Sequence, residues 1–316
     1  MTSTSARPDI LIAAALPPHL MQRLQDHFTC HDANALSEAA LAAIAPSIRG
    51  IASKGETKVS REYIARFPAL EIISVFGVGY DGVDAVAARE RGIEVTNTPD
   101  VLTDDVADFA MTLLLATARR VVDADRFARS GEWKKGPFAL TTKVTGSRLG
   151  IVGLGRIGKA IAKRAAAFDM DISYHNRSSQ SDVPYRYVAD LKTLAGEVDF
   201  LVLSMPGGAG TRALINADVL DALGPKGFLI NVARGSVVDE TALIKALQEG
   251  KIAGAGLDVF ENEPNVPEAL AKLPNLTLTP HMASGTVITR TAMADLAFDN
   301  LQAHFSGKPL LTPVPR

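Results

Sequence analysis

A glycine pattern in the middle of the chain places the strongest constraint on its fold. Gly153, Gly155 and Gly158 have the G-x-G-x-x-G spacing, and a short apolar run, 149–152, precedes them. A helical pattern and a second apolar run, 172–174, follow. Strand, tight turn, helix and strand in this order are typical of a dinucleotide site, whereas a simple glycine-rich turn would not need this context. We therefore predict that the whole motif binds a cofactor, through Gly153, Leu154, Gly155, Arg156, Ile157 and Gly158.

The end of the second strand indicates which dinucleotide is bound. NAD-selective sites usually place Asp or Glu there, where it accepts a hydrogen bond from the ribose 2′-hydroxyl. Here the chain reads His175-Asn176-Arg177-Ser178, and the first acid is Asp182. Arg177 can pair with a 2′-phosphate, and Asn176 and Ser178 can donate hydrogen bonds to it. A solvated arginine in a turn is the alternative, but this position favours NADPH, with NADH bound more weakly.

Length, charge and cysteine content exclude several classes of protein. The 316 residues suffice for two domains. Because 33 Lys and Arg nearly balance 35 Asp and Glu, neither nucleic acid nor a membrane is expected as a partner. The single cysteine, Cys30, excludes an intrachain disulfide and a multi-cysteine metal site, so no metal is expected. The apolar run Ile10–Leu16 is short for a signal peptide, and we interpret it as a buried strand of a cytoplasmic enzyme.

Strand and helix patterns alternate along most of the chain. Residues 1–99 contain one set of such units, and residues 147–284 contain another that begins with the glycine motif. This alternation predicts parallel sheets covered by helices on both faces. The last helix, from about Thr286 to His304, could return to the first set. We therefore expect a discontinuous domain of residues 1–99 and 286–316, and a dinucleotide-binding domain of residues 100–285.

The longest helical pattern, from Asp104 to about Phe127, belongs to neither set. A polar segment, Ser130–Lys143, follows it and contains the only tryptophan, Trp133. A helix and loop outside both sheets are suited to bridging domains or subunits.

Three polar residues in the C-terminal third each follow a predicted strand. Arg234 follows residues 228–232, Glu263 lies at the end of GLDVFENEP, and His281 follows residues 276–279. Singly, each could be a surface or capping residue. Because the carboxyl ends of parallel strands open onto the ligand crevice, we expect all three to converge near the nicotinamide.

The chemistry of these three residues suits the reduction of a 2-oxo acid. The imidazolium of His281 can donate a proton to the ketone oxygen, because the unperturbed pKa of histidine is about 6.5. The carboxylate of Glu263 would raise the pKa of His281 and orient its ring. Arg234 would bind the substrate carboxylate with two hydrogen bonds and polarise the adjacent ketone.

Longer motifs extend the pattern to nearly the whole chain. They are VFGVGYDGVD (75–84), GIEVTNTPDVLTDDVADFA (92–110), GLGRIG (153–158), NVARGSVVDE (231–240), AGLDVFENEP (255–264) and PHMASGT (280–286). The chain resembles the NAD(P)-dependent D-isomer-specific 2-hydroxyacid dehydrogenases, above all the glyoxylate/hydroxypyruvate reductases and the plant-type hydroxyphenylpyruvate reductases. The resemblance implies an α/β fold of two doubly wound parallel-sheet domains, a Rossmann coenzyme domain and a flavodoxin-like discontinuous substrate domain. It also implies a homodimer, with the helix and loop of residues 101–146 at the subunit contact.

The resemblance implies roles for individual residues as well. Arg234, Glu263 and His281 would be the catalytic set, and Arg234 and His281 would contact the substrate together with the backbone N–H groups of Val78 and Gly79. Thr103 would lie beside the nicotinamide, and Asp258 would bind its carboxamide. The other implied cofactor contacts are Met205, Pro206, Val232, Ala233, His281 and Ser284. Gly207-Gly208 departs from the Leu-Thr that relatives often have, which puts side-chain contacts there in doubt.

The expected substrates are small 2-oxo acids, glyoxylate and hydroxypyruvate, with a bulky one such as hydroxyphenylpyruvate as the alternative. The candidate side-chain pocket consists of Phe76, Tyr80, Val101 and Met282, plus Trp133 of the partner subunit. Formate dehydrogenases share the architecture but lack the Glu–His pair. Phosphoglycerate dehydrogenases often carry an extra C-terminal region, and this sequence ends soon after its last predicted helix. A non-enzymatic alternative is a nicotinamide-sensing, corepressor-like binding protein, against which the near-neutral charge and the Asn176–Ser178 segment argue.

Overall fold

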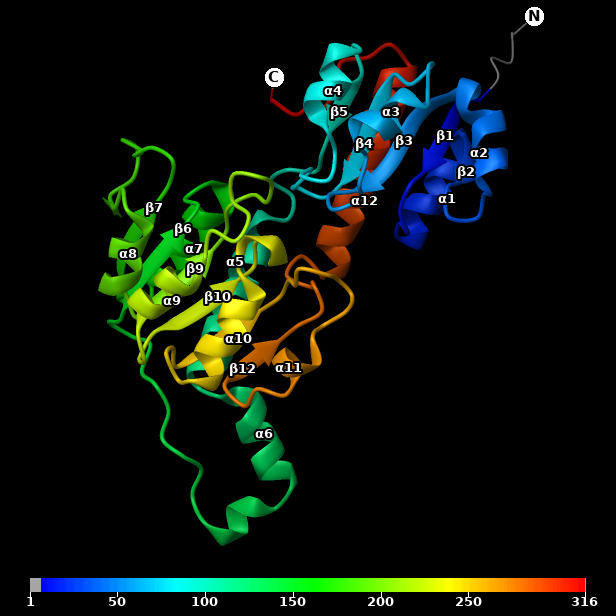
Figure 1. Ribbon diagram of the computed structural model, residues 1–316. Coiled ribbons are helices and arrows are strands. Elements are labelled where there is room, and N and C mark those ends of the chain that lie inside the picture. Colours follow the sequence, from blue (N-terminus) through cyan, green and yellow to red (C-terminus); the bar gives the residue numbers. More distant parts are fainter. Residues whose placement is uncertain (1–6, 316) are drawn as a thin grey trace, which may run out of the picture. The chain divides into compact units, whose positions relative to one another are not determined.

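The computed structural model describes residues 7–315, which form two compact units. One unit comprises Met1–Leu102, as far as it is described, and Thr286–Arg316, and the other comprises Thr103–Gly285. Each unit is built on a parallel β-sheet with helices packed against it (Figure 1). The predicted fold class is therefore confirmed.

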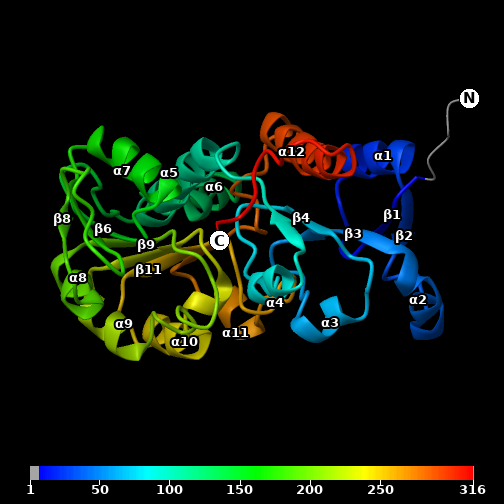
Figure 2. The same cartoon turned by 90° about the horizontal axis from the view of Figure 1, so that it is seen from above.

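The first unit contains a five-stranded sheet with the strand order β2-β1-β3-β4-β5. Helices α1 and α12 cover one face of this sheet, and α2, α3 and α4 lie on the other (Figure 2). Ser74 Oγ of β4 donates a hydrogen bond to Ala297 O of α12 at 2.9 Å, so the last helix belongs to the first unit. The bounds are β1 (Asp9–Ile12), α1 (Pro18–His27), β2 (Thr29–Asp32), α2 (Glu38–Ile44), β3 (Ile48–Lys54), α3 (Arg61–Ala65), β4 (Ile72–Phe76), α4 (Ala85–Glu90), β5 (Glu94–Thr96) and α12 (Val287–Phe305).

The second unit contains a seven-stranded sheet with the order β12-β11-β10-β9-β6-β7-β8. Helices α5 and α7 lie on one face, and α8, α9 and α10 lie on the other (Figure 2). The chain runs from β6 outward to β8 and then crosses back to β9 on the other side of β6. The order in which strands are added therefore reverses between β6 and β9, where such folds bind ligands. The bounds are β6 (Arg148–Val152), α7 (Arg156–Ala166), β7 (Asp171–His175), β8 (Arg186–Tyr187), α8 (Leu191–Glu197), β9 (Phe200–Leu203), α9 (Ala217–Leu223), β10 (Phe228–Asn231), α10 (Glu240–Gln248), β11 (Gly254–Leu257), α11 (Glu268–Ala271) and β12 (Leu276–Leu278).

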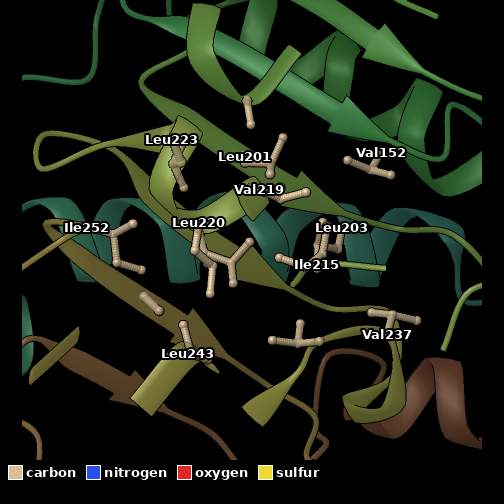
Figure 3. Packing of buried hydrophobic residues seen from close by; sticks show 14 of the residues in the cluster. Val152, Leu201, Leu203, Ile215, Val219, Leu220, Leu223, Val237, Leu243 and Ile252 are labelled. Carbon is tan, nitrogen blue, oxygen red and sulfur yellow. The ribbon is translucent and has the colours of Figure 1, made fainter. Parts of the chain in front are cut away.

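An apolar cluster fixes the second sheet against its helices (Figure 3). Leu201 and Leu203 lie two residues apart on β9, so both face the same side of the sheet, and they belong to one buried cluster with Leu220 of α9 and Leu243 of α10. These four side chains are fully buried. Burying a leucine contributes about 1.5–3 kcal/mol, so the cluster holds the carboxyl ends of the central strands in place.

The single helix predicted from Asp104 to Phe127 is wrong. The structure has two helices, α5 (Thr103–Ala118) and α6 (Val121–Arg129), joined at Arg120 with a left-handed φ of 50°. The Arg120 guanidinium pairs with Asp123 at 3.0 Å and lies over the Phe138 ring, and these contacts hold the bend. The apolar pattern continues across the break, which is why periodicity alone did not reveal it.

The first predicted strand also ends earlier than expected, at Ile12, and the edge strands β2 and β8 were not predicted. Both edge strands are short and largely polar, so neither has the alternating apolar residues by which a strand is recognised. Among residues 7–315, no helix has the length and apolar character required to cross a membrane.

Candidate active site

Gly153 and Gly155 of the motif lie in the turn between β6 and α7, and Gly158 lies in the first turn of α7. Gly153 has a φ of +97°, and a Cβ there would lie 2.6 Å from the backbone nitrogen of Met205. A Cβ on Gly158 would lie 2.3 Å from the carbonyl oxygen of Gly153, so only glycine lets the helix pack so closely. At Gly155 a Cβ would meet no atom within 4 Å, which leaves the turn open on the side where a pyrophosphate would approach. These residues fit a dinucleotide.

The segment predicted to bind the 2′-phosphate directly follows β7. Arg177 and Ser178 are exposed, and Asn176 is half-buried. The Asn176 Oδ1 accepts a hydrogen bond from the backbone nitrogen of Leu154 at 2.7 Å, which ties this segment to the glycine turn. Arg156 and Ile157 open α7, and the Leu154 side chain is buried, so only its backbone could face a nucleotide.

Five of the remaining predicted cofactor residues follow strands of the same sheet, and Thr103 begins a helix. Met205 and Pro206 follow β9, Val232 and Ala233 follow β10, and Ser284 lies in the loop after β12. Thr103 is the first residue of α5 and is half-buried. Their contacts with the cofactor remain predictions.

Asp258 holds the loop that carries His281. It is 1% exposed, and its Oδ1 accepts hydrogen bonds from Thr279 Oγ1 at 2.7 Å and Met282 N at 2.9 Å. Its Oδ2 accepts one from Ala283 N at 2.9 Å. Burial raises the pKa of the Asp258 carboxyl, and these hydrogen bonds oppose the rise. No sequence pattern indicated this positioning role, and the predicted contact with the nicotinamide carboxamide stays a prediction.

Glu263 and His281 form a hydrogen-bonded pair. His281 Nδ1 lies 2.7 Å from Glu263 Oε2, and Glu263 Oε1 accepts a hydrogen bond from Phe260 N at 3.0 Å. Burial raises the pKa of the Glu263 carboxyl, but the hydrogen bond and charge of His281, with smaller effects of Phe260 N–H and Arg234, lower it further, so that the net shift is downward. His281 adopts a left-handed φ of 49°, and its backbone nitrogen donates to Asp258 O at 2.8 Å. The carboxylate thus stays charged and fixes the imidazole by one nitrogen.

Arg234 lies in a turn that packs against the same loop. Asn231, which is 1% exposed, closes this turn by donating from Nδ2 to Arg234 O at 2.9 Å. A Cβ on Gly235 would lie 1.8 Å from the carbonyl carbon of Phe260, so the two backbones are in direct contact. The structure therefore brings Arg234, Glu263 and His281 together in one unit, as the sequence predicts.

Val78 and Gly79, the predicted carboxylate donors, lie after β4 in the first unit. The Val78 carbonyl accepts a hydrogen bond from Asn97 Nδ2 at 2.7 Å, and Gly77 N donates to Thr98 Oγ1 at 3.1 Å. Within residues 7–315 the backbone N–H groups of Val78 and Gly79 have no acceptor, and both residues are half-buried. These N–H groups can therefore donate hydrogen bonds to an anion, and their contact with substrate stays a prediction.

Two further residues shape the site and were not predicted. Ser204, directly after β9, donates from Oγ to Gly153 O at 2.8 Å and thereby braces the glycine turn. Glu240, the first residue of α10, accepts a hydrogen bond from Glu261 N at 2.7 Å and so holds the loop that carries Glu263. Burial raises the pKa of Glu240, with this hydrogen bond opposing it. The sequence offered only weak signals for them, a serine after a strand and an acid beside a helix cap.

Comparison with known proteins decides the family. The sequence profile of the D-isomer specific 2-hydroxyacid dehydrogenase, NAD binding domain, matches residues 111–283. The chain belongs to the D-isomer specific 2-hydroxyacid dehydrogenases. The resemblance that the motifs indicated is therefore confirmed.

Relatives of this dehydrogenase match it over most of their length. The hydroxyphenylpyruvate reductase of Plectranthus scutellarioides is 54% identical over 274 residues, 87% of this chain and 88% of the relative. The 2-ketogluconate reductase of Gluconobacter oxydans is 48% identical over 310 residues, 98% of this chain and 99% of the relative. A crystal structure of an NADPH-dependent glyoxylate/hydroxypyruvate reductase from Sinorhizobium meliloti, in complex with NADP and malonate, has a TM-score of 0.92 and 50% identity, and the match covers 98% of this chain and 97% of that one.

Proposed function

We propose that this dehydrogenase reduces small 2-oxo acids, glyoxylate and hydroxypyruvate, to the corresponding 2-hydroxy acids with NADPH. The hydrogen-bonded Glu263–His281 pair beside Arg234 carries the proposal, because ketone reduction next to a carboxylate requires a proton donor and a fixed cation. NADPH, when bound, supplies the hydride. Relatives support the choice of substrate class, since they include glyoxylate/hydroxypyruvate reductases.

Each residue of the trio has one task in this proposal. Glu263 holds Nδ1 of His281, so Nε2 is the nitrogen that exchanges a proton with the ketone oxygen of the substrate. Arg234 binds the substrate carboxylate and stabilises the negative charge that develops on the ketone oxygen. The N–H groups of Val78 and Gly79 are proposed as further donors to the carboxylate.

The size of the 2-oxo acid that the enzyme accepts is to be measured. Relatives include a hydroxyphenylpyruvate reductase and a 2-ketogluconate reductase, whose substrates are bulkier than glyoxylate. A pocket separates such analogues by about 1–3 kcal/mol per group, so that several acids can be accepted. The test is kcat/KM with NADPH for glyoxylate, hydroxypyruvate, hydroxyphenylpyruvate and 2-ketogluconate. Turnover of none of them would contradict the proposal and favour the corepressor-like binding protein.

Cofactor preference is the first prediction. We expect kcat/KM with NADPH to exceed that with NADH by at least about tenfold, because a charged hydrogen bond from Arg177 to the 2′-phosphate is worth roughly 1.5–3 kcal/mol. Arg177→Asp should reverse the preference, since a carboxylate repels the phosphate and accepts from a 2′-hydroxyl. Arg186→Ala, which removes an exposed arginine paired with Glu197, is the control and should leave it unchanged. Equal use of both cofactors by the unaltered enzyme would contradict the assignment.

The pH profile of Glu263→Gln is the second prediction. His281 lowers the pKa of Glu263, so by reciprocity the Glu263 carboxylate favours the protonated imidazole. Without this carboxylate, protonated His281 is lost earlier as pH rises, and the basic limb of kcat/KM should move to lower pH.

Glu240→Gln is the matched control for this variant. It removes a half-buried carboxylate of α10 that contacts the loop carrying Glu263, while keeping an oxygen that accepts from Glu261 N. Among the described residues Glu240 makes no hydrogen bond to His281. The basic limb of kcat/KM should therefore move less in Glu240→Gln than in Glu263→Gln. An unchanged profile in Glu263→Gln would remove Glu263 from its role.

We also propose a homodimer that forms through α6 and the segment after it. Large apolar side chains are unusually exposed there, with Val121 at 53%, Trp133 at 71% and Leu140 at 100%. In Figure 1 α6 and the following segment extend away from the seven-stranded sheet, so they can reach a second copy. Sedimentation velocity tests this proposal, and a mass of one 33.5 kDa chain would contradict it. We also propose a cytoplasmic location, because NADPH, the proposed cofactor, is an intracellular reductant.

A further inference from the structure

The loop that follows β7 is tied to the glycine turn by two amide side chains. Leu154 lies between Gly153 and Gly155, and both polar groups of its backbone are held. Its N–H donates to Asn176 Oδ1 at 2.7 Å, and its carbonyl oxygen accepts from Gln180 Nε2 at 2.6 Å. The turn that would receive the pyrophosphate and the loop that would receive the 2′-phosphate are therefore one connected structure.

The same loop is anchored in the sheet by two tyrosines. Gln180 N donates to the hydroxyl of Tyr174 at 2.7 Å, and the Tyr174 residue is fully buried in β7. Tyr187 of β8 donates from its hydroxyl to Asn176 O at 3.2 Å, and its ring lies 5.5 Å from that of Tyr174. Asn176 and Gln180 are thus fixed at both ends of the loop, and only residues 177–179 between them are exposed.

These anchors determine which groups the loop offers to a ligand. The Leu154 N–H is a donor, so the Asn176 atom that faces it must be the oxygen, and the amide nitrogen remains a donor without a partner among residues 7–315. Arg177 and Ser178 have no side-chain partner within residues 7–315. The nearby carboxylate of Asp182 is paired with Lys159 Nζ at 2.7 Å. The exposed part of the loop therefore offers donors and a cation to an anion.

We propose that Gln180 is a positioning residue for recognition of the 2′-phosphate of NADPH. It does not touch the phosphate. It locks the loop onto Leu154, so that the Asn176 amide and the Arg177 and Ser178 side chains are ordered before the cofactor binds, and binding does not have to order them. The inference rests on the proposed NADPH preference and adds a residue that sets its strength.

Gln180→Met tests the proposal, since methionine keeps the length of the side chain but cannot donate to Leu154 O. Dissociation constants for NADPH and NADH are measured by calorimetry on the full chain, with Tm and kcat at saturating NADPH. We expect the dissociation constant for NADPH to rise about 3- to 10-fold, that for NADH to change less, and kcat to stay the same. Ser179→Ala, in the same loop but without a contact to Leu154, is the control and should change neither constant.

The outcomes separate this inference from the proposed function. A preference for NADPH that persists unchanged in Gln180→Met overturns the role of Gln180 alone. This includes an equal loss of affinity for both cofactors, which is what a merely structural role predicts. No preference in the unaltered enzyme overturns both proposals. If Gln180→Met does not fold, Tyr174→Phe removes the hydroxyl that accepts from Gln180 N and should weaken NADPH binding selectively as well.

Discussion

His281→Ala is expected to lower kcat for the reduction of hydroxypyruvate by roughly 10²- to 10⁴-fold, the usual contribution of a general acid. The affinity for NADPH should stay within about twofold, because the imidazole is paired with Glu263 and acts on the substrate oxygen in the proposed mechanism. Steady-state kinetics give kcat, and calorimetry without substrate gives the dissociation constant for NADPH.

An exposed histidine supplies the control for this experiment. His19 forms a comparable pair with Asp295 at 2.9 Å on the first unit, and its side chain is 50% exposed. His19→Ala should therefore keep kcat close to that of the unaltered enzyme. Near-normal turnover in His281→Ala would transfer the proton donor to another group, and a parallel loss of NADPH affinity would mean that the imidazole belongs to the cofactor site.

The convergence of the proposed catalytic trio could be predicted because its position follows from chain topology. Arg234, Glu263 and His281 are far apart in sequence, yet each follows a strand of one parallel sheet, and the carboxyl ends of such strands meet at one edge. The glycine turn was predictable for a related reason, since the contacts of Gly153 and Gly158 leave no room for a side chain. In both cases the backbone geometry dictates the residue type.

The supports of the site could not be predicted in the same way. Asp258, whose contact with the nicotinamide carboxamide stays a prediction, also holds Thr279, Met282 and Ala283 with its carboxylate. Which hydrogen bonds a buried carboxylate makes depends on the fold of a loop that has no periodic pattern. Gln180 reaches back 26 positions to Leu154, and no local spacing encodes such a contact. The bend at Arg120 is of the same kind, because its contact with the Phe138 ring arises only once the chain has turned.

Arg234→Lys separates charge from geometry at the proposed carboxylate site. Lysine keeps the positive charge, but it cannot present two parallel N–H donors to a planar carboxylate. Losing one charged hydrogen bond costs about 1.5–3 kcal/mol, so we expect kcat/KM for hydroxypyruvate to fall roughly 10- to 150-fold. The dissociation constant for NADPH should not change.

Arg212→Lys is the matched control for Arg234→Lys, because Arg212 lies on the same unit and pairs with Glu261 of the loop that carries Glu263. Its side chain is 65% exposed, and an exposed ion pair tolerates lysine, so kcat/KM should remain near that of the unaltered enzyme. If Arg234→Lys also kept near-normal kcat/KM, a single point charge would suffice at this position. The two-point grip on the carboxylate would then have to come from other donors, and the N–H groups of Val78 and Gly79 would be the first to examine, because they have no acceptor among the described residues.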